Sequence, residues 1–146
     1  MKICVDTTVL LDVLKDEFRE CQDQLYAAIE NNEDLLVPSV VYAELMPQFN
    51  ADIKLLNSFL KEHRINIEHL DIESAMTASQ RWMKYLKRKS KKQCPQCGLL
   101  LDLKEHFLSD FYIGGYALTK CNAIITRDRG IYRKYFPELQ GYEDCL

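Results

Sequence analysis

The stretch Ile3-Cys4-Val5-Asp6-Thr7-Thr8-Val9-Leu10-Leu11, close to the beginning of the sequence, decides the fold. Its first part is a short apolar run that ends at Asp6, which is typical of a strand buried in a parallel sheet. The two threonines that follow can cap a helix, and apolar residues then recur at helical spacing as far as Leu14. The stretch therefore predicts a buried strand that leads directly into a helix, with an acidic residue at the junction.

The same alternation of strand and helix signals continues along the sequence. Short apolar or alternating runs predict further strands at residues 35–37, 65–70 and 123–126. Amphipathic spacing predicts helices over residues 9–17, 21–31, 39–49, 53–63, 72–86, 109–120 and 130–136. Short apolar strands that alternate with helices are typical of α/β folds with a parallel sheet.

Two adjacent glycines, Gly114 and Gly115, lie inside the helix predicted to begin with Ser109 as its N-cap. Each glycine costs about 1 kcal/mol of helix stability relative to alanine. This cost indicates close packing of the helix on the sheet. Close packing would also give Asp110, in the first turn of the same helix, a fixed position.

The composition indicates one domain over residues 1–146. The chain has 146 residues and is 47% hydrophobic, enough for one sizeable core. A net charge of -3 excludes a globally basic nucleic-acid binder, and only 5 Gly and 4 Pro exclude a low-complexity chain. No apolar run approaches the roughly 18 residues that a membrane span needs, and the acid at position 6 comes too early for a secretory signal. We therefore expect a soluble, cytoplasmic protein.

The pattern of elements breaks at about residues 87–105, which we interpret as an insertion in this domain. A basic run without acids, from Lys84 to Lys92, leads into it. Such a run is usually a solvated helix end, but its charges would also give the salt-dependent grip that RNA requires. A second basic patch lies beside Asp128 and consists of Arg127, Arg129, Arg133 and Lys134.

The insertion also contains the sequence Cys94-Pro95-Gln96-Cys97-Gly98. Its spacing lets both thiolates bind one zinc ion, with Gly98 permitting the tight turn. A closed structural zinc site needs four ligands, and no second pair of this kind is present. The missing ligands could come from His106, Cys121, Cys145 or a partner subunit. The alternative is a vestigial knuckle with free or oxidised thiols.

Four acidic residues are candidates for a common site. Asp6 and Asp128 each follow a predicted strand, and ligands of open α/β sheets bind at the carboxyl ends of the strands. Glu44 lies within an apolar stretch over residues 40–46, and Asp110 precedes another over residues 111–118. A lone charge in such a stretch is costly unless it is paired or binds a metal. Taken singly, each acid could equally be an ordinary surface carboxylate.

Gathered carboxylates would need a cation, because they repel one another and raise one another's pKa. Hard oxygen ligands select Mg²⁺ or Mn²⁺. One or two such ions can activate water and stabilise charge on a phosphodiester during in-line displacement. The four acids therefore predict a metal-dependent site that hydrolyses phosphodiesters.

Four stretches of the sequence resemble the PIN domain family, and within it the VapC-like prokaryotic branch. They span residues 5–11, 41–45, 109–118 and 125–130, and the tail over residues 129–139 resembles archaeal members in particular. The resemblance implies a Rossmann-like three-layer α/β/α sandwich with a mainly parallel central sheet. It also implies a Mg²⁺- or Mn²⁺-dependent endoribonuclease that hydrolyses RNA.

Carried over to this sequence, the family's acidic metal site consists of Asp6, Glu44, Asp110 and Asp128, with Thr7 and Thr126 in support. VapC-like proteins are often toxins held inactive by an antitoxin protein, and they commonly form homodimers. The insertion at residues 87–105 departs from the compact toxin pattern, so a role in RNA processing is the alternative within the same chemistry.

Three rival functions fit the sequence less well. A non-catalytic RNA- or protein-binding module could keep the fold, although the intact set of four acids argues against it. A haloacid-dehalogenase-type phosphatase needs a second Asp two residues after the first, where this sequence has Thr8. A phosphoacceptor receiver domain needs an acidic pair at the end of the first strand, and none is evident.

Overall fold

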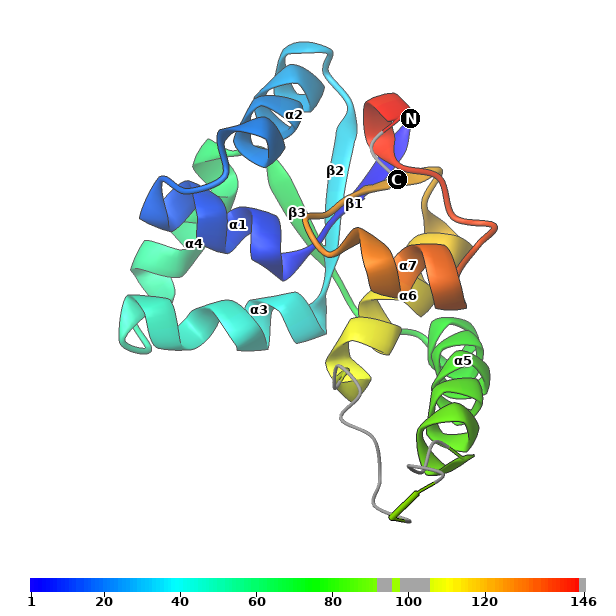
Figure 1. Cartoon of the computed structure of the whole chain (residues 1–146). Helices are drawn as coiled ribbons and strands as arrows, with labels where there is room; N and C mark the ends of the chain where they lie inside the picture. The colour runs from blue at the N-terminus through cyan, green and yellow to red at the C-terminus, as the bar shows by residue number, and fades with distance from the viewer. Residues whose placement is uncertain (92–95, 98–105, 145–146) are drawn as a thin grey trace.

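The computed structural model describes residues 1–91, 96–97 and 106–144, and these residues form an α/β fold (Figure 1). The described residues contain four parallel strands in the order β3-β2-β1-β4. The strands are β1 (Lys2–Val5), β2 (Asp34–Pro38), β3 (Ile65–Glu68) and β4 (Ala123–Ile125). The predicted α/β class with a parallel sheet is confirmed.

Seven α-helices accompany the sheet in the described residues. They are α1 (Thr7–Lys15), α2 (Arg19–Glu30), α3 (Ser39–Leu45), α4 (Ile53–Glu62), α5 (Ile72–Lys91), α6 (Leu108–Lys120) and α7 (Arg129–Tyr135). There are also two short 3-10 helices, η1 (Met46–Phe49) and η2 (Tyr142–Asp144). Figure 1 shows α1 to α4 on one side of the sheet and α5 to α7 on the other. No helix in the described part of the chain is long and apolar enough to cross a membrane.

The central position of β1 explains its apolar sequence. Cys4 pairs with Leu36 of β2 on one side and with Ile124 of β4 on the other. The side chains at positions 3–5 are completely buried. A strand with neighbours on both edges and helices on both faces has no solvent-facing side, so its residues do not alternate between apolar and polar.

The order of the strands reverses next to β1, and such a reversal is where α/β folds usually bind ligands. The chain crosses from β1 to β2 to β3 in one direction and then returns to place β4 on the other side of β1. Ligands of open α/β sheets bind in the crevice at such a reversal, outside the carboxyl ends of the strands. Asp6 follows β1 directly, and its backbone N–H donates to the carbonyl of Ile125 at the end of β4 (3.0 Å).

Most of the predicted helices begin or end one or two residues away from the observed bounds, and three of the differences have a clear physical reason. The helix expected over residues 39–49 is divided into α3 and η1, since Pro47 has no N–H to continue the helix. Helix α5 continues to Lys91 instead of ending at residue 86, because Lys and Arg are good helix formers. The interpretation of residues 87–105 as an insertion stays a prediction, since residues 92–95 and 98–105 lie outside the described part.

The third difference concerns the beginning of α6. Ser109 was expected to be the N-cap, but that position belongs to Phe107. The Phe107 N–H donates to the carboxylate of Asp110 (3.2 Å), and the Asp110 N–H donates back to the Phe107 carbonyl (3.0 Å). Asp110 therefore organises the first turn, which leaves the Ser109 hydroxyl available for another partner.

The two glycines of α6 allow a close approach to α5 and Phe136 rather than to the sheet, which corrects the expectation from the sequence. A Cβ atom on Gly115 would lie 2.5 Å from the Ser74 carbonyl oxygen and 2.8 Å from the Ala78 nitrogen, both in α5. A Cβ atom on Gly114 would lie 2.5 Å from the ring of Phe136. The tight contact between α5 and α6 fixes the position of α6 on the molecule, and Asp110 with it.

Replacing Gly115 with alanine should therefore destabilise the fold. The backbone of α5 would have to move, and overpacking of this kind costs about 1–3 kcal/mol of unfolding free energy. Gly130→Ala is the matched control. A Cβ at that position would have no atom within 4 Å apart from its chain neighbours and the nearby backbone of its own helix. Urea denaturation followed by circular dichroism measures both variants. Equal stability of Gly115→Ala and Gly130→Ala would contradict the packing described here.

Candidate active site

Asp6 is the buried centre of the acidic site. Its side chain is only 2% exposed, and its Oδ2 atom accepts hydrogen bonds from Thr126 Oγ1 (2.7 Å) and Thr8 Oγ1 (3.1 Å). The pKa of Asp6 is raised from 3.8 to about 6, chiefly by burial and in smaller part by the charges of Asp110 and Glu44, although the two hydrogen bonds lower it. Asp6 is therefore a buried carboxylate within the electrostatic reach of two other acids.

Glu44 belongs to the same group of acids, although its side chain is exposed. Its Oε1 atom accepts from Thr7 Oγ1 (2.8 Å), and its Oε2 atom accepts a long hydrogen bond from Ser109 Oγ (3.4 Å). Desolvation by the surrounding protein raises the pKa of Glu44, and the charge of Asp110 raises it as well. The two hydroxyl groups hold the carboxylate of α3 toward the beginnings of α1 and α6.

Asp128 is connected to Asp6 through a single threonine. The Asp128 N–H donates to Thr126 Oγ1 (3.0 Å), and the same hydroxyl donates to Asp6 Oδ2 (2.7 Å). Asp128 is half-buried at the N-cap of α7. The supporting hydrogen bonds that the resemblance implied for Thr7 and Thr126 are thus present, to Glu44 and Asp6 respectively.

Tyr132 lies among these acids, and the sequence analysis does not identify it as a site residue. It is completely buried, and its hydroxyl has no hydrogen-bond partner among the described residues. Burial raises its pKa, and the charges of Asp6, Asp110 and Asp128 raise it further. Tyr132 follows Asp128 by one helical turn, so both belong to the same face of α7. That spacing was the signal by which the sequence could have indicated it.

The donor chemistry of the site fits a hard cation, but the observed side-chain arrangement is not a finished metal cage. All four acids offer oxygen ligands, which Mg²⁺ and Mn²⁺ prefer. Buried hydroxyls are normally hydrogen-bonded, so the unpaired Tyr132 hydroxyl also fits a site that takes up a further polar group. Within the described ranges, however, no three Asp, Glu, His or Cys side chains form a group that could hold a metal ion as they stand. The carboxylates accept hydrogen bonds from their neighbours instead, and binding an ion would require side-chain rotation.

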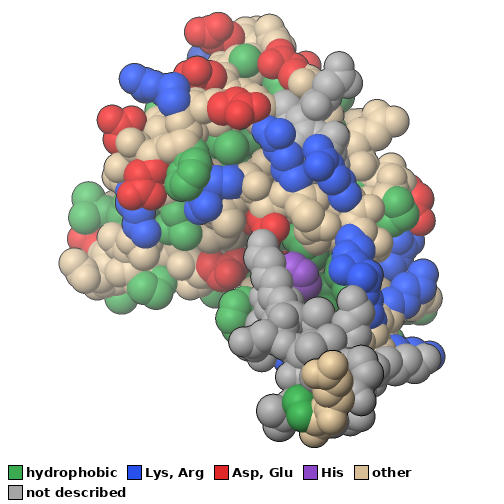
Figure 2. Space-filling model, in the orientation of Figure 1, with side chains coloured by type: hydrophobic (Ala, Val, Ile, Leu, Met, Phe, Trp, Pro, Cys, Tyr) green, Lys and Arg blue, Asp and Glu red, His purple; other side chains and the backbone are tan. Residues whose placement is uncertain are grey.

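Basic side chains accompany the acidic site on one side. Lys84 and Arg88 are exposed on α5, and Arg133 and Lys134 are exposed on α7. Figure 2 shows Lys and Arg side chains over these two helices, beside the acidic side chains in the middle of this face. Both basic patches named from the sequence therefore have exposed members. Lys92, at the end of the first patch, lies outside the described residues.

The zinc hypothesis gains no support. Cys94 lies outside the described residues, as does Cys145, and Cys97 is an exposed free thiol. The part of the chain that the structure describes contains no metal-holding group of His, Cys, Asp or Glu. Cys121, which was a candidate zinc ligand, instead contacts the buried thiol of Cys4, and this contact lowers the pKa of Cys121.

The burial of Asp6 makes a prediction about stability in the presence of a chelator. Since folding raises the pKa of Asp6 to about 6, the folded state binds a proton more tightly than the unfolded state, and stability falls as the pH rises from about 4 to 6. Asp6→Asn removes this penalty while keeping an oxygen that can accept from Thr126. At pH 8 in EDTA the variant should exceed the wild type by on the order of 3 kcal/mol of unfolding free energy.

The difference should shrink as the pH falls below 6 and disappear below about pH 3, where Asp6 is protonated in both states. Urea denaturation as a function of pH measures it, with Asp23→Asn, an exposed carboxylate of α2, as the control that changes little. An Asp6→Asn protein less stable than the wild type at pH 8 would show that Asp6 is not a strained buried charge.

Comparison with known proteins identifies the family and the fold. Residues 3–137 match the PIN domain family. The VapBC2 structure from Rickettsia felis, bound to a DNA fragment from their promoter, aligns with a TM-score of 0.64 and 17% identity over 95% of this chain and 96% of that chain. VapBC-1 from nontypeable Haemophilus influenzae aligns with a TM-score of 0.66 and 16% identity over 97% of this chain and 96% of that chain.

At these identities the structural likeness concerns the fold alone, and no curated protein matches the sequence. The resemblance of the tail to archaeal members stays a prediction. PIN domain proteins are typically nucleases and generally use Mg²⁺. The family match spans nearly all of the sequence, and the fold and the acidic end of its sheet agree with it: this chain belongs to the PIN domain family.

Proposed function

We propose that this chain is a divalent-metal-dependent endoribonuclease whose catalytic acids are Asp6, Glu44, Asp110 and Asp128. The observation that carries the proposal is the position of Asp6, a buried carboxylate at the reversal of the strand order, within the influence of Glu44 and Asp110. Membership of a family of typical nucleases supports this reading. A buried carboxylate close to other negative charges is costly to maintain for stability alone, so a function that uses the charge of Asp6 is favoured.

The four carboxylates would hold Mg²⁺ or Mn²⁺. When bound, the ion supplies positive charge that offsets the carboxylates and stabilises charge on the phosphodiester under attack. The protein contributes the placement of the acids. Thr126 fixes one oxygen of Asp6, and Thr7 orients Glu44. The Tyr132 hydroxyl, which has no partner among the described residues, is a buried donor for a polar group that enters between the acids.

RNA is the proposed substrate because the acids lie beside exposed positive charge. Lys84 and Arg88 of α5 and Arg133 and Lys134 of α7 are exposed, and Figure 2 shows Lys and Arg side chains on the same face as acidic ones. Lys and Arg that neutralise backbone phosphates bind nucleic acid without regard to sequence and release it as the salt concentration rises. The net charge of the chain is -3, so the positive charge is local and would guide the strand to the acids.

The biological role that we propose is that of a toxin in a toxin–antitoxin pair, acting in the cytoplasm. The support is the similarity of the fold, over almost the whole chain, to the VapBC structures. The proposed partners are an antitoxin protein and a second copy of the chain. RNA processing is the alternative role for the same chemistry.

Cleavage of single-stranded RNA by the purified protein tests the proposed activity. We expect cleavage with Mg²⁺ or Mn²⁺ and none after EDTA treatment. Asp6→Asn or Asp110→Asn should lower the cleavage rate about 100-fold or more, the scale on which a single charge-stabilising group acts. Asp23→Asn, on the outer surface of α2, should cleave like the wild type. RNA that is bound but left intact with every divalent ion would favour the non-catalytic binding module instead.

Expression in a bacterial host separates the two proposed roles. A toxin should arrest growth on induction, and Asp6→Asn should abolish the arrest because it removes the central carboxylate without unfolding the protein. Viable counts after induction measure the effect. Undiminished growth with active wild-type nuclease in the cell extract would contradict the toxin role and favour RNA processing.

A further inference from the structure

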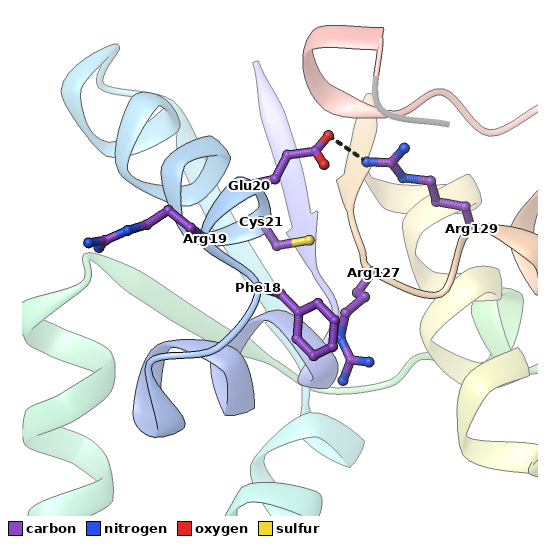
Figure 3. A pocket seen from close by; sticks show the side chains of 6 residues that line it. All are labelled: Phe18, Arg19, Glu20, Cys21, Arg127 and Arg129. Carbon is purple, nitrogen blue, oxygen red and sulfur yellow. Dashed lines mark hydrogen bonds and ion pairs between the residues drawn. The ribbon is translucent and has the colours of Figure 1, made fainter.

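A separate pocket lies next to the acids, between the beginning of α2 and the segment that joins β4 to α7 (Figure 3). Its volume is about 460 Å³, within the range of about 300–1,000 Å³ that is usual for small-ligand sites. It is lined by Phe18, Arg19, Glu20, Cys21, Arg127 and Arg129. None of these residues belongs to the four acids, and the function proposed above does not use the pocket.

The pocket and the acidic site share one short segment of the chain. Arg127 and Arg129 flank Asp128, and Thr126, which holds Asp6, comes immediately before them. A strand of RNA whose phosphodiester is bound at the acids would therefore have the pocket within reach of a neighbouring nucleotide.

Phe18 is an unusual residue for the surface of this pocket. Its side chain is 55% exposed, and its backbone has a φ of 49°, in the left-handed region. A residue other than glycine in that region is strained by roughly 1–2 kcal/mol. The fold thus keeps an apolar ring largely in water at the cost of backbone strain, and burial in the core does not explain this arrangement.

The side chain of Arg127 stacks on the Phe18 ring. The guanidinium carbon of Arg127 lies 4.1 Å from the centre of the Phe18 ring. The Arg127 Nε donates to Asp12 Oδ2 (3.0 Å), and Asp12 is only 1% exposed, so the guanidinium is anchored from below. Aromatic rings and planar guanidinium groups are the surfaces on which unpaired bases stack.

Arg129 provides the charge for a phosphate. It pairs with Glu20 (2.9 Å), whose side chain is 73% exposed. An exposed pair of this kind contributes little to stability, so a phosphate can take the place of Glu20. The Arg19 side chain points away from the other five in Figure 3, so its guanidinium is given no part.

We propose that this pocket is the subsite for one unpaired nucleotide of the RNA, next to the phosphodiester at the acids. The base stacks on the surface formed by Phe18 and Arg127, and the backbone phosphate pairs with Arg129. Every base has an aromatic face, so the subsite accepts any base but requires one to be present. The proposal rests on the proposed function and names the part of the substrate that this region holds.

The test is a set of single-stranded RNAs, each with one abasic position, bound to the Asp6→Asn protein so that the RNA stays intact. Fluorescence anisotropy gives the Kd. Phe18→Ala should raise the Kd for intact RNA about 5- to 100-fold, as is usual for loss of an aromatic stacking partner. One abasic position should weaken binding to the Phe18 protein by a similar factor and leave binding to Phe18→Ala unchanged. Phe18→Trp should restore tight binding.

Tyr26→Ala is the matched control, since Tyr26 is an exposed aromatic residue of α2, the helix that Phe18 precedes as its N-cap, and its loss should leave the Kd unchanged. The ring of Phe18 is largely exposed, so circular dichroism should show an intact fold in every variant. A Kd for Phe18→Ala equal to that of Tyr26→Ala, or an abasic penalty that is the same in both proteins at every position, would overturn the subsite. Wild-type cleavage of RNA would then still stand, whereas absence of cleavage with a base-dependent Phe18 effect would overturn the nuclease and leave RNA binding.

Discussion

The hydrogen bond from Thr126 to Asp6 is the contact on which the rest of the site depends. It joins the ends of two adjacent strands across 120 residues of sequence (2.7 Å) and gives a buried carboxylate a partner. The same hydroxyl accepts from the backbone of Asp128, so one threonine positions two acids. Without it, a carboxylate that is 2% exposed would face the charges of Glu44 and Asp110 with less compensation, and the end of the sheet would lose its defined geometry.

The fold was predictable because its strongest signals are local. A strand between two parallel neighbours has no solvent-facing side, so β1 appears in the sequence as a continuous apolar run that stops at Asp6. The helices follow from amphipathic spacing in the same way. The four acids could be named because Asp6 and Asp128 follow predicted strands, whereas Glu44 and Asp110 lie in or next to apolar stretches, where a charge is conspicuous. What the sequence lacked was the evidence that they share one place, which depends on the order of the strands.

The residues that sequence reasoning missed are those whose role depends on tertiary contacts. Tyr132 is distinguished by a buried hydroxyl without a described partner, and Phe18 by exposure and a left-handed backbone. Neither property is visible in a residue's identity. The glycines of α6 were recognised as sites of close approach, but the neighbour proved to be α5, because the partner of a helix face cannot be deduced from that helix alone. Ser109 lost the N-cap position because Asp110 organises the first turn itself.

The proposed nuclease activity requires that remote carboxylates meet around a divalent ion. A crystal structure of the protein soaked in Mn²⁺, with the ion located by its anomalous scattering, tests this requirement most directly. We predict a peak within about 2.2 Å of a carboxylate oxygen of Asp6. After rotation of their side chains, at least two of Glu44, Asp110 and Asp128 should coordinate the same ion. A map without a peak at Asp6, with Glu44 and Asp110 turned into solvent, would contradict it.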